Sequence, residues 1–109
     1  MKVAVAATAP ELDATIDQRF GRCAWILVVD TESMELEPIE NPGALAGTGA
    51  AIAAAQLVSD AGADAAVAGS FGPNAIGALK AGGITLYTAG GGTVREAALA
   101  AANGELREL

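Results

Sequence analysis

The sequence predicts a single α/β domain spanning residues 1–109, built as a three-layer α/β/α sandwich around a mixed sheet of about five strands. Three observations lead to this fold class. The chain has 109 residues and a hydrophobic content of 52%, which is enough to close one core. Its first half holds three strand-like segments in succession, and its second half alternates helical segments with short buried strands.

The first half of the chain is typical of an antiparallel meander. Lys2–Ala7 combines small and β-branched residues and reads as a buried strand, and Trp25–Asp30 reads as a second one. Residues 31–33 turn the chain into a third strand over residues 34–39. That strand alternates apolar residues with glutamates and contains Pro38, which favours an edge position with one face in water.

The second half carries the signals that begin and end helices. Thr48 can cap a helix that runs to Gly62, after which residues 64–68 form a buried strand. Pro73 is placed as the first residue of a second helix, which ends at residues 82–83.

The last strand and the last helix complete the pattern. Residues 84–87 form the strand, and Thr93 and Glu96 have the capping-box spacing of a helix that runs to residues 103–104. The order β-β-β-α-β-α-β-α gives a mixed sheet. The ligand crevice of such sheets lies outside the carboxyl ends of the parallel strands.

Composition excludes several classes of function. A formal net charge of −7 argues against sequence-independent binding to nucleic acid or to an anionic membrane. No apolar run is long enough for a membrane span and the start does not resemble a signal peptide, so we expect a cytoplasmic protein. Without histidine there is no imidazole ligand or Ser-His-Asp arrangement, and the common nucleotide-binding glycine motifs are also missing. No nucleophile or general base is visible, so we expect no enzyme activity.

Two glycine-rich loops follow predicted strands and enter predicted helices, at residues 69–74 and 89–93. Their backbone amides could form a nest of donors for an anion, with Gly72, Asn74 and the Gly91-Gly92 pair at the sheet edge. The alternative is that the glycines only permit tight turns.

Three of the six basic residues, all arginines, lie beside glycines or at a predicted helix start. Arg95 enters the third helix where the helix dipole disfavours a cation, so it either faces an anion or pairs with Glu96 or another neighbour. Arg19 and Arg22 flank Phe20 and Gly21, which indicates a functional loop or an exposed loop anchored by a buried ring.

Two further features stay open. Cys23, the one cysteine, is a candidate ligand for a soft metal or a small buried hydrophobic residue. Residues 43–49 form a long connection of small residues, either a flap that closes over a ligand or a plain linker.

The motifs in this order resemble the dinitrogenase iron–molybdenum cofactor biosynthesis family, and most of all its orange-protein branch. The resemblance covers nearly the whole chain. It rests on the strand with its Ala-Thr end, Arg19-Phe20-Gly21-Arg22, Asn41-Pro42, Gly72-Pro73-Asn74, and Gly90-Gly91-Gly92-Thr93-Val94-Arg95-Glu96.

This resemblance implies a ribonuclease-H-like fold without nuclease activity. It further implies a carrier that binds, stores or delivers an anionic metal–sulfur cluster containing molybdenum with copper or with iron, held non-covalently. By position, the cluster-binding residues are Arg19, Phe20, Gly21, Arg22, Gly72, Pro73, Asn74, Gly91, Gly92, Thr93 and Arg95, with Cys23 as the candidate metal ligand. The missing histidine puts other direct ligation in doubt.

Two other hypotheses remain beside the carrier. One is a protein–protein module that uses the acidic segment 32–40, in a cofactor-assembly or cell-division-linked complex. The other is an enzyme for a small phosphate ligand that uses the same glycine loops.

Overall fold

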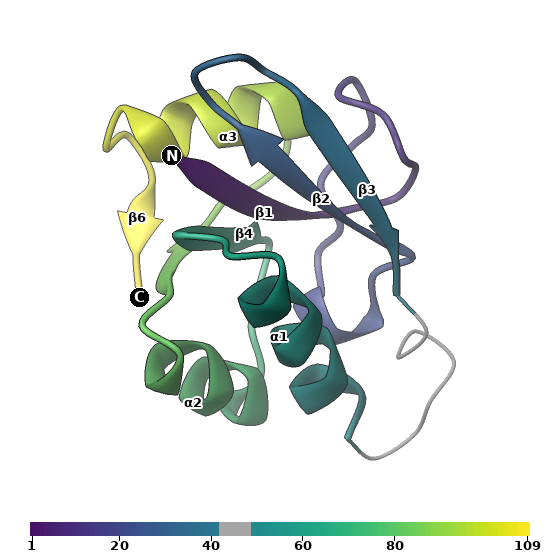
Figure 1. Ribbon diagram of the computed structural model, residues 1–109, viewed down its shortest axis with the longest axis vertical. Helices are drawn as coiled ribbons and strands as arrows, with labels where there is room; N and C mark the ends of the chain where they lie inside the picture. The colour runs from purple at the N-terminus through teal and green to yellow at the C-terminus, as the bar shows by residue number, and fades with distance from the viewer. Residues whose placement is uncertain (42–48) are drawn as a thin grey trace.

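The computed structural model describes residues 1–41 and 49–109 and shows one six-stranded mixed sheet with helices on both faces (Figure 1). In chain order the elements are β1 (Lys2–Ala7), the 3-10 helix η1 (Phe20–Arg22), β2 (Trp25–Asp30), β3 (Leu36–Glu40), α1 (Ala50–Asp60), β4 (Ala65–Ala68), α2 (Pro73–Ala81), β5 (Thr85–Thr88), α3 (Val94–Ala102) and β6 (Arg107–Glu108).

The sheet confirms the predicted fold class. Its strand order is β3-β2-β1-β4-β5-β6, with β1, β4 and β5 parallel to one another and β1, β2 and β3 forming the antiparallel meander. The strand β6 pairs antiparallel with β5 and was not predicted. A two-residue strand has no periodicity from which it could be recognised.

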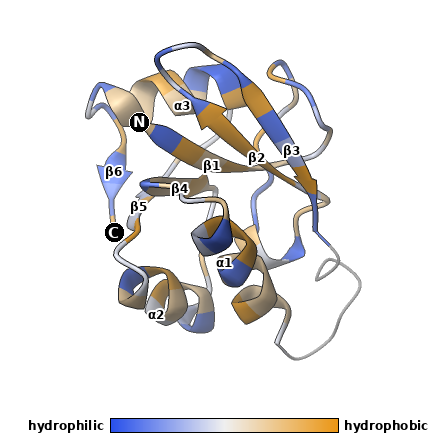
Figure 2. Cartoon of the chain, viewed as in Figure 1, coloured by the Kyte–Doolittle hydropathy of each residue, from blue (hydrophilic) through white to orange (hydrophobic). Residues whose placement is uncertain are grey.

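Two hydrophobic clusters, one on each face of the sheet, make the three layers. The helices α1 and α2 pack side by side on one face together with η1, and α3 covers the other (Figure 1). The strands β1 and β2 are hydrophobic along nearly their whole length (Figure 2) because both of their faces are buried. Burying each Val, Leu or Ile side chain contributes about 1.5–3 kcal/mol to folding.

The third strand begins two residues later than predicted. Residue Met34 has a φ of 60° and belongs to the turn, whose end is closed by a hydrogen bond from the Asp30 amide to the Glu35 carbonyl. The strand β3 is the predicted edge strand, and Glu37, Pro38 and Glu40 on it are exposed.

The first helix starts at Ala50, and its N-cap is Gly49 in the left-handed conformation. The predicted cap Thr48 lies outside the described residues, as does the candidate flap at residues 43–49 except for Gly49.

Residues 12–19, called the strap from here on, precede η1 and lie across the carboxyl edge of the parallel strands. Bridges join Thr15 to Thr93 and Arg19 to Ser70, so the segment reaches from the β5–α3 loop to the β4–α2 loop. It is fixed beside β1 by a 2.8 Å hydrogen bond from the Asp17 amide to the Ala6 carbonyl. This strap separates the two glycine-rich loops.

Candidate functional site

A cavity of about 430 Å³ opens where η1, the start of α1 and the β4–α2 loop meet. Its lining contains two arginines, two phenylalanines and small or polar residues: Arg19, Phe20, Gly21, Arg22, Gly49, Ala50, Ala51, Ser70, Phe71, Gly72 and Asn74. None of these residues is a carboxylate, a cysteine or a histidine. The charged groups of the lining are therefore positive, although the chain carries a net charge of −7.

Two helices begin at this cavity. Gly49, Ala50 and Ala51 form the start of α1, and Gly72 is the N-cap of α2. Within the part of the chain that the structure describes, the first-turn amides of Asn74 and Ala75 donate no hydrogen bond. A helix N-terminus carries a partial positive charge and free N–H groups, so both helices favour an anion here.

The loop with the two cavity arginines is anchored by its aromatic residue. Phe20 is buried, and its ring packs against that of Phe71 with 5.2 Å between centroids. The Phe20 amide donates to the Ser70 carbonyl at 3.2 Å, and the Ser70 hydroxyl donates to the Gln18 carbonyl at 2.8 Å. The loop is therefore anchored by a buried ring, and the same ring forms part of the cavity wall.

Gly21 lies where the loop approaches α1 closely. A Cβ atom at Gly21 would lie 3.1 Å from the Ala51 Cα and 3.2 Å from its Cβ. Gly72 is different, because a Cβ there would meet no atom within 4 Å. Only the first of these two glycines is explained by packing.

Cys23 is fully buried beneath the loop. Its thiol donates to the Phe20 carbonyl at 3.0 Å. Burial, and secondarily the negative charge of Asp17, raise the pKa of Cys23 to about 12. Cys23 also does not line the cavity, so its sulfur is not among the groups that a ligand there would meet. Among the described residues, no group of three or more His, Cys, Asp or Glu side chains could hold a metal ion.

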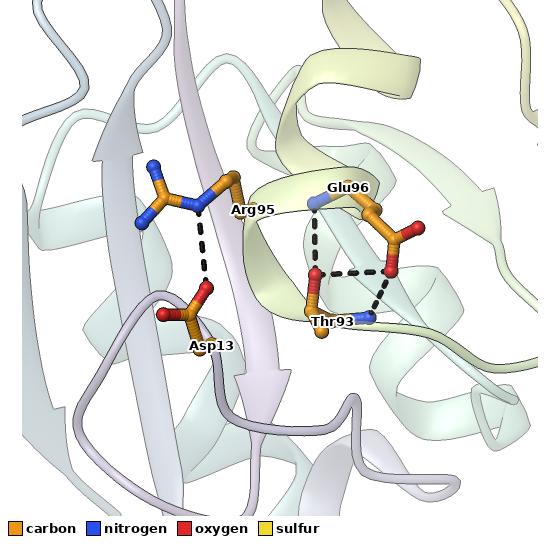
Figure 3. A network of polar contacts seen from close by, with 4 residues as sticks. All are labelled: Asp13, Thr93, Arg95 and Glu96. Carbon is orange, nitrogen blue, oxygen red and sulfur yellow. Dashed lines mark hydrogen bonds and ion pairs between the residues drawn. The ribbon is translucent and has the colours of Figure 1, made fainter.

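The amides at the start of α3 are already occupied. Thr93 and Glu96 form the predicted capping box, with the Glu96 amide donating to the Thr93 hydroxyl at 3.2 Å and the Thr93 amide donating to the Glu96 carboxylate at 3.0 Å (Figure 3). The next two amides, of Val94 and Arg95, donate to carbonyls of the strap at 2.9 Å each. This helix start has no donors left for a ligand.

Arg95 is paired within the protein. Its Nε lies 3.3 Å from a carboxylate oxygen of Asp13 (Figure 3). This is the alternative in which the arginine has a neighbouring partner, although that partner is Asp13 and not Glu96.

The structure brings together one part of the sequence-predicted site and not the other. Around the cavity lie Arg19, Phe20, Gly21, Arg22, Gly72 and Asn74, with Pro73 between the last two as the first residue of α2. Six predicted residues do not line it: Pro73, the candidate ligand Cys23, and Gly91, Gly92, Thr93 and Arg95 at the start of α3. The strap bridges to Ser70 in the first glycine-rich loop and to Thr93 in the second. Its carbonyls accept hydrogen bonds from the Val94 and Arg95 amides, so the start of α3 does not join the first loop in one nest of donors.

Comparison with protein families gives a match over residues 1–104 to the model described as dinitrogenase iron-molybdenum cofactor. The chain belongs to this family. The resemblance found in the sequence motifs is thereby confirmed. A comparison with curated proteins gave no match.

Solved structures of the same fold include close relatives. The apo form of the orange protein from Desulfovibrio gigas is 36% identical with a TM-score of 0.93, over 99% of this chain and 92% of that one. A candidate NifB protein from Thermotoga is also 36% identical, with a TM-score of 0.84 and the same coverage of both chains. A candidate dinitrogenase from Methanocaldococcus jannaschii, at 17% identity and a TM-score of 0.72 over 100% and 94% of the two chains, shares the fold.

None of the helices in the described ranges is long and apolar enough to cross a membrane.

Proposed function

We propose that this protein binds and carries a preassembled anionic metal–sulfur cluster in the cavity between η1, α1 and α2, and that it does not transform the cluster chemically. Membership in a family described by the iron–molybdenum cofactor, and similarity to the orange protein, support a metal cluster as the ligand class. The observation that carries the proposal is the convergence of two helix N-termini and two arginines on one cavity.

The donor set suits a cluster that brings its own sulfide ligands. Arginine and backbone N–H groups neutralise negative charge without entering the coordination shell of a metal. Phe20, Phe71 and the two alanines add apolar wall, which suits large and weakly hydrated sulfide faces. Molybdenum with copper, or molybdenum with iron, is the composition that we propose. In this account Cys23 supports the loop from beneath and is not a ligand.

The proposed site leaves out Gly91, Gly92, Thr93 and Arg95, because none of them lines the cavity. In addition, the Thr93 amide is used by the capping box and Arg95 pairs with Asp13. It retains Arg19, Phe20, Gly21, Arg22, Gly72, Pro73 and Asn74. The carrier role is supported by the lining residues that the structure describes, since they include no carboxylate, thiol or imidazole that could act as nucleophile or base. We also propose a cytoplasmic location and a partner protein that accepts the cluster.

Anaerobic reconstitution tests the proposal. The purified chain is incubated with tetrathiomolybdate and copper, or with tetrathiomolybdate, iron and sulfide, and then passed through gel filtration. We expect a visible chromophore and a fixed ratio of molybdenum to protein in the protein peak. A colourless peak without metal under both conditions would refute a cluster carrier.

The same cavity geometry is suited to a phosphate group, because helix N-termini bind phosphates as well. A thermal-shift screen with nucleotides and phosphosugars therefore runs in parallel. A large rise in melting temperature there, without metal, would favour the small-phosphate alternative.

A further inference from the structure

Asn41 is the only buried side chain of polar or charged type among the residues that the structure describes, at 3% exposure. It follows directly after β3 and does not line the cavity. A buried amide side chain costs free energy unless its polar atoms are satisfied, so its partners indicate what it does.

Several hydrogen bonds join Asn41 to one end of the arginine loop, including a 3.7 Å contact from its Nδ2 to the Cys23 Sγ. Its Nδ2 donates to the Cys23 carbonyl at 2.9 Å and, over a longer 3.5 Å, to the Gly21 carbonyl. Its backbone amide donates to the Ala24 carbonyl at 3.1 Å. One residue therefore ties the end of β3 to peptide units on both sides of Arg22.

The loop needs such support because its own hydrogen bonds are long. Inside η1 the Arg22 amide donates to the Arg19 carbonyl at 3.3 Å, and the Cys23 amide donates to the Phe20 carbonyl at 3.4 Å. No side chain caps this three-residue helix at its start. Short 3-10 turns of this kind have poor hydrogen-bond geometry and depend on outside contacts.

The direction of the carbonyls also matters for an anion. Gly21 lines the cavity, yet its carbonyl oxygen accepts a hydrogen bond from Asn41. A carbonyl oxygen carries partial negative charge and would repel an anionic ligand if it turned into the cavity. The Asn41 amide holds two carbonyls of the loop in the protein interior.

We infer that Asn41 is a positioning residue for the anion site: it fixes the Arg19–Arg22 loop and keeps the Gly21 and Cys23 carbonyls away from the ligand. The inference rests on the proposed function, since it assigns the loop to ligand binding. The side chain acts through the loop and does not touch the ligand.

The test uses Asn41→Ala, with Asn41→Ser as a milder change that keeps one donor if the alanine variant does not fold. Val94→Ala on α3 is the matched control, because it removes buried volume from the opposite face of the sheet. Tetrathiomolybdate alone is the probe, and three quantities are measured: its dissociation constant, its induced visible circular dichroism at saturation, and amide hydrogen exchange in the free protein.

In Asn41→Ala we expect a dissociation constant about 10-fold higher, as for the loss of one positioning hydrogen bond. We also expect altered induced circular dichroism at saturation and faster exchange of the Arg22 and Cys23 amides. Asn41→Ser should lie between Asn41→Ala and wild type. Val94→Ala should keep wild-type affinity and spectrum, since a general loss of stability does not change the geometry of the folded site.

The outcomes separate the two claims. If wild type binds the probe and the folded Asn41 variants bind it equally well with the same spectrum, the positioning role is overturned and the anion site stands. Unchanged exchange at Arg22 and Cys23 in these variants overturns the role as well. If wild type itself binds no probe, the proposed function fails, and the purpose assigned to Asn41 fails with it.

Discussion

The guanidinium of Arg95 lies 3.3 Å from the carboxylate of Asp13, on the side of the sheet that α3 covers. Arg19 and Arg22 belong to the opposite side, where η1 packs against α1. The three arginines that lie beside glycines or at a helix start in the sequence therefore do not form one group. Arg19 and Arg22 line the cavity, whereas Arg95 joins the start of α3 to Asp13 of the strap by an ion pair.

The first prediction concerns Arg95→Ala. We expect cluster retention equal to wild type, because Arg95 does not line the cavity, and a change in the free energy of unfolding of less than about 1 kcal/mol, since the ion pair is exposed. The molybdenum content after gel filtration and a urea titration measure the two quantities. A large loss of retention would restore the site that the sequence motif predicts and would move the ligand toward α3.

The second prediction concerns the capping box. Thr93→Ala removes the hydroxyl that accepts from the Glu96 amide, so the free energy of unfolding should fall by about 1 kcal/mol. Affinity for the probe should not change, because these amides serve the helix and not a ligand. Chemical denaturation checks the first statement and probe titration the second; weaker binding in a fully folded variant would show that this loop takes part in the site.

The third prediction compares two glycines of the cavity. Gly21→Ala should lower the free energy of unfolding by about 1–3 kcal/mol, because its Cβ would lie 3.1 Å from the Ala51 Cα. Gly72→Ala should change stability by less than about 1 kcal/mol, because its φ of −76° suits any residue and its Cβ meets nothing within 4 Å, so only the weaker N-capping by alanine acts against it. Thermal unfolding of both variants checks this contrast. Equal losses would mean that the approach of η1 to α1 is not tight.

The fourth prediction is a pH dependence that comes from Cys23. The folded chain holds the thiol proton up to a pKa of about 12, whereas the unfolded chain releases it near 9.0. Above pH 9 the unfolded state therefore binds fewer protons than the folded state, and stability should fall with rising pH by roughly 1 kcal/mol per pH unit.

The matched variant for this titration is Cys23→Ala, which lacks the group and should show a smaller alkaline loss of stability. Urea denaturation between pH 8 and pH 11 gives the comparison. Parallel curves for the two proteins would show that the thiol is not buried as described. Alkylation of native Cys23 at pH 8 should also be slow, because the reactive species is the thiolate.

The strands and helices with strong local signals could be predicted from the sequence. The bounds of β1 and β2 follow from buried β-branched runs, and Pro73 marks the first residue of α2. The capping box at Thr93 was predicted as well. The two-residue strand β6 and the turn at Met34 depend on tertiary contacts and left no pattern in the sequence.

Residue type made some residues around the cavity recognisable in the sequence, whereas the contacts between distant segments were not recognisable. The Arg19–Arg22 loop and Gly72 stand out by residue type, and the structure brings them to one cavity. The Val94 and Arg95 amides at the start of α3 donate to backbone carbonyls of the strap, at Ala14 and Leu12. Backbone carbonyls leave no motif in the sequence, so these hydrogen bonds could not be predicted. The role of Asn41 depends on burial and on partners about 20 residues away in the chain, which a sequence motif does not reveal.

The most direct test of the central claim is the ratio of molybdenum to protein in the double variant Arg19→Ala/Arg22→Ala after reconstitution and gel filtration. The control is Lys80→Ala/Arg107→Ala, which makes the same change in net charge with two residues that do not line the cavity. We predict that the control retains the wild-type ratio and that the arginine variant loses most of its molybdenum. Equal retention by the two variants would contradict a cluster site at η1, α1 and α2.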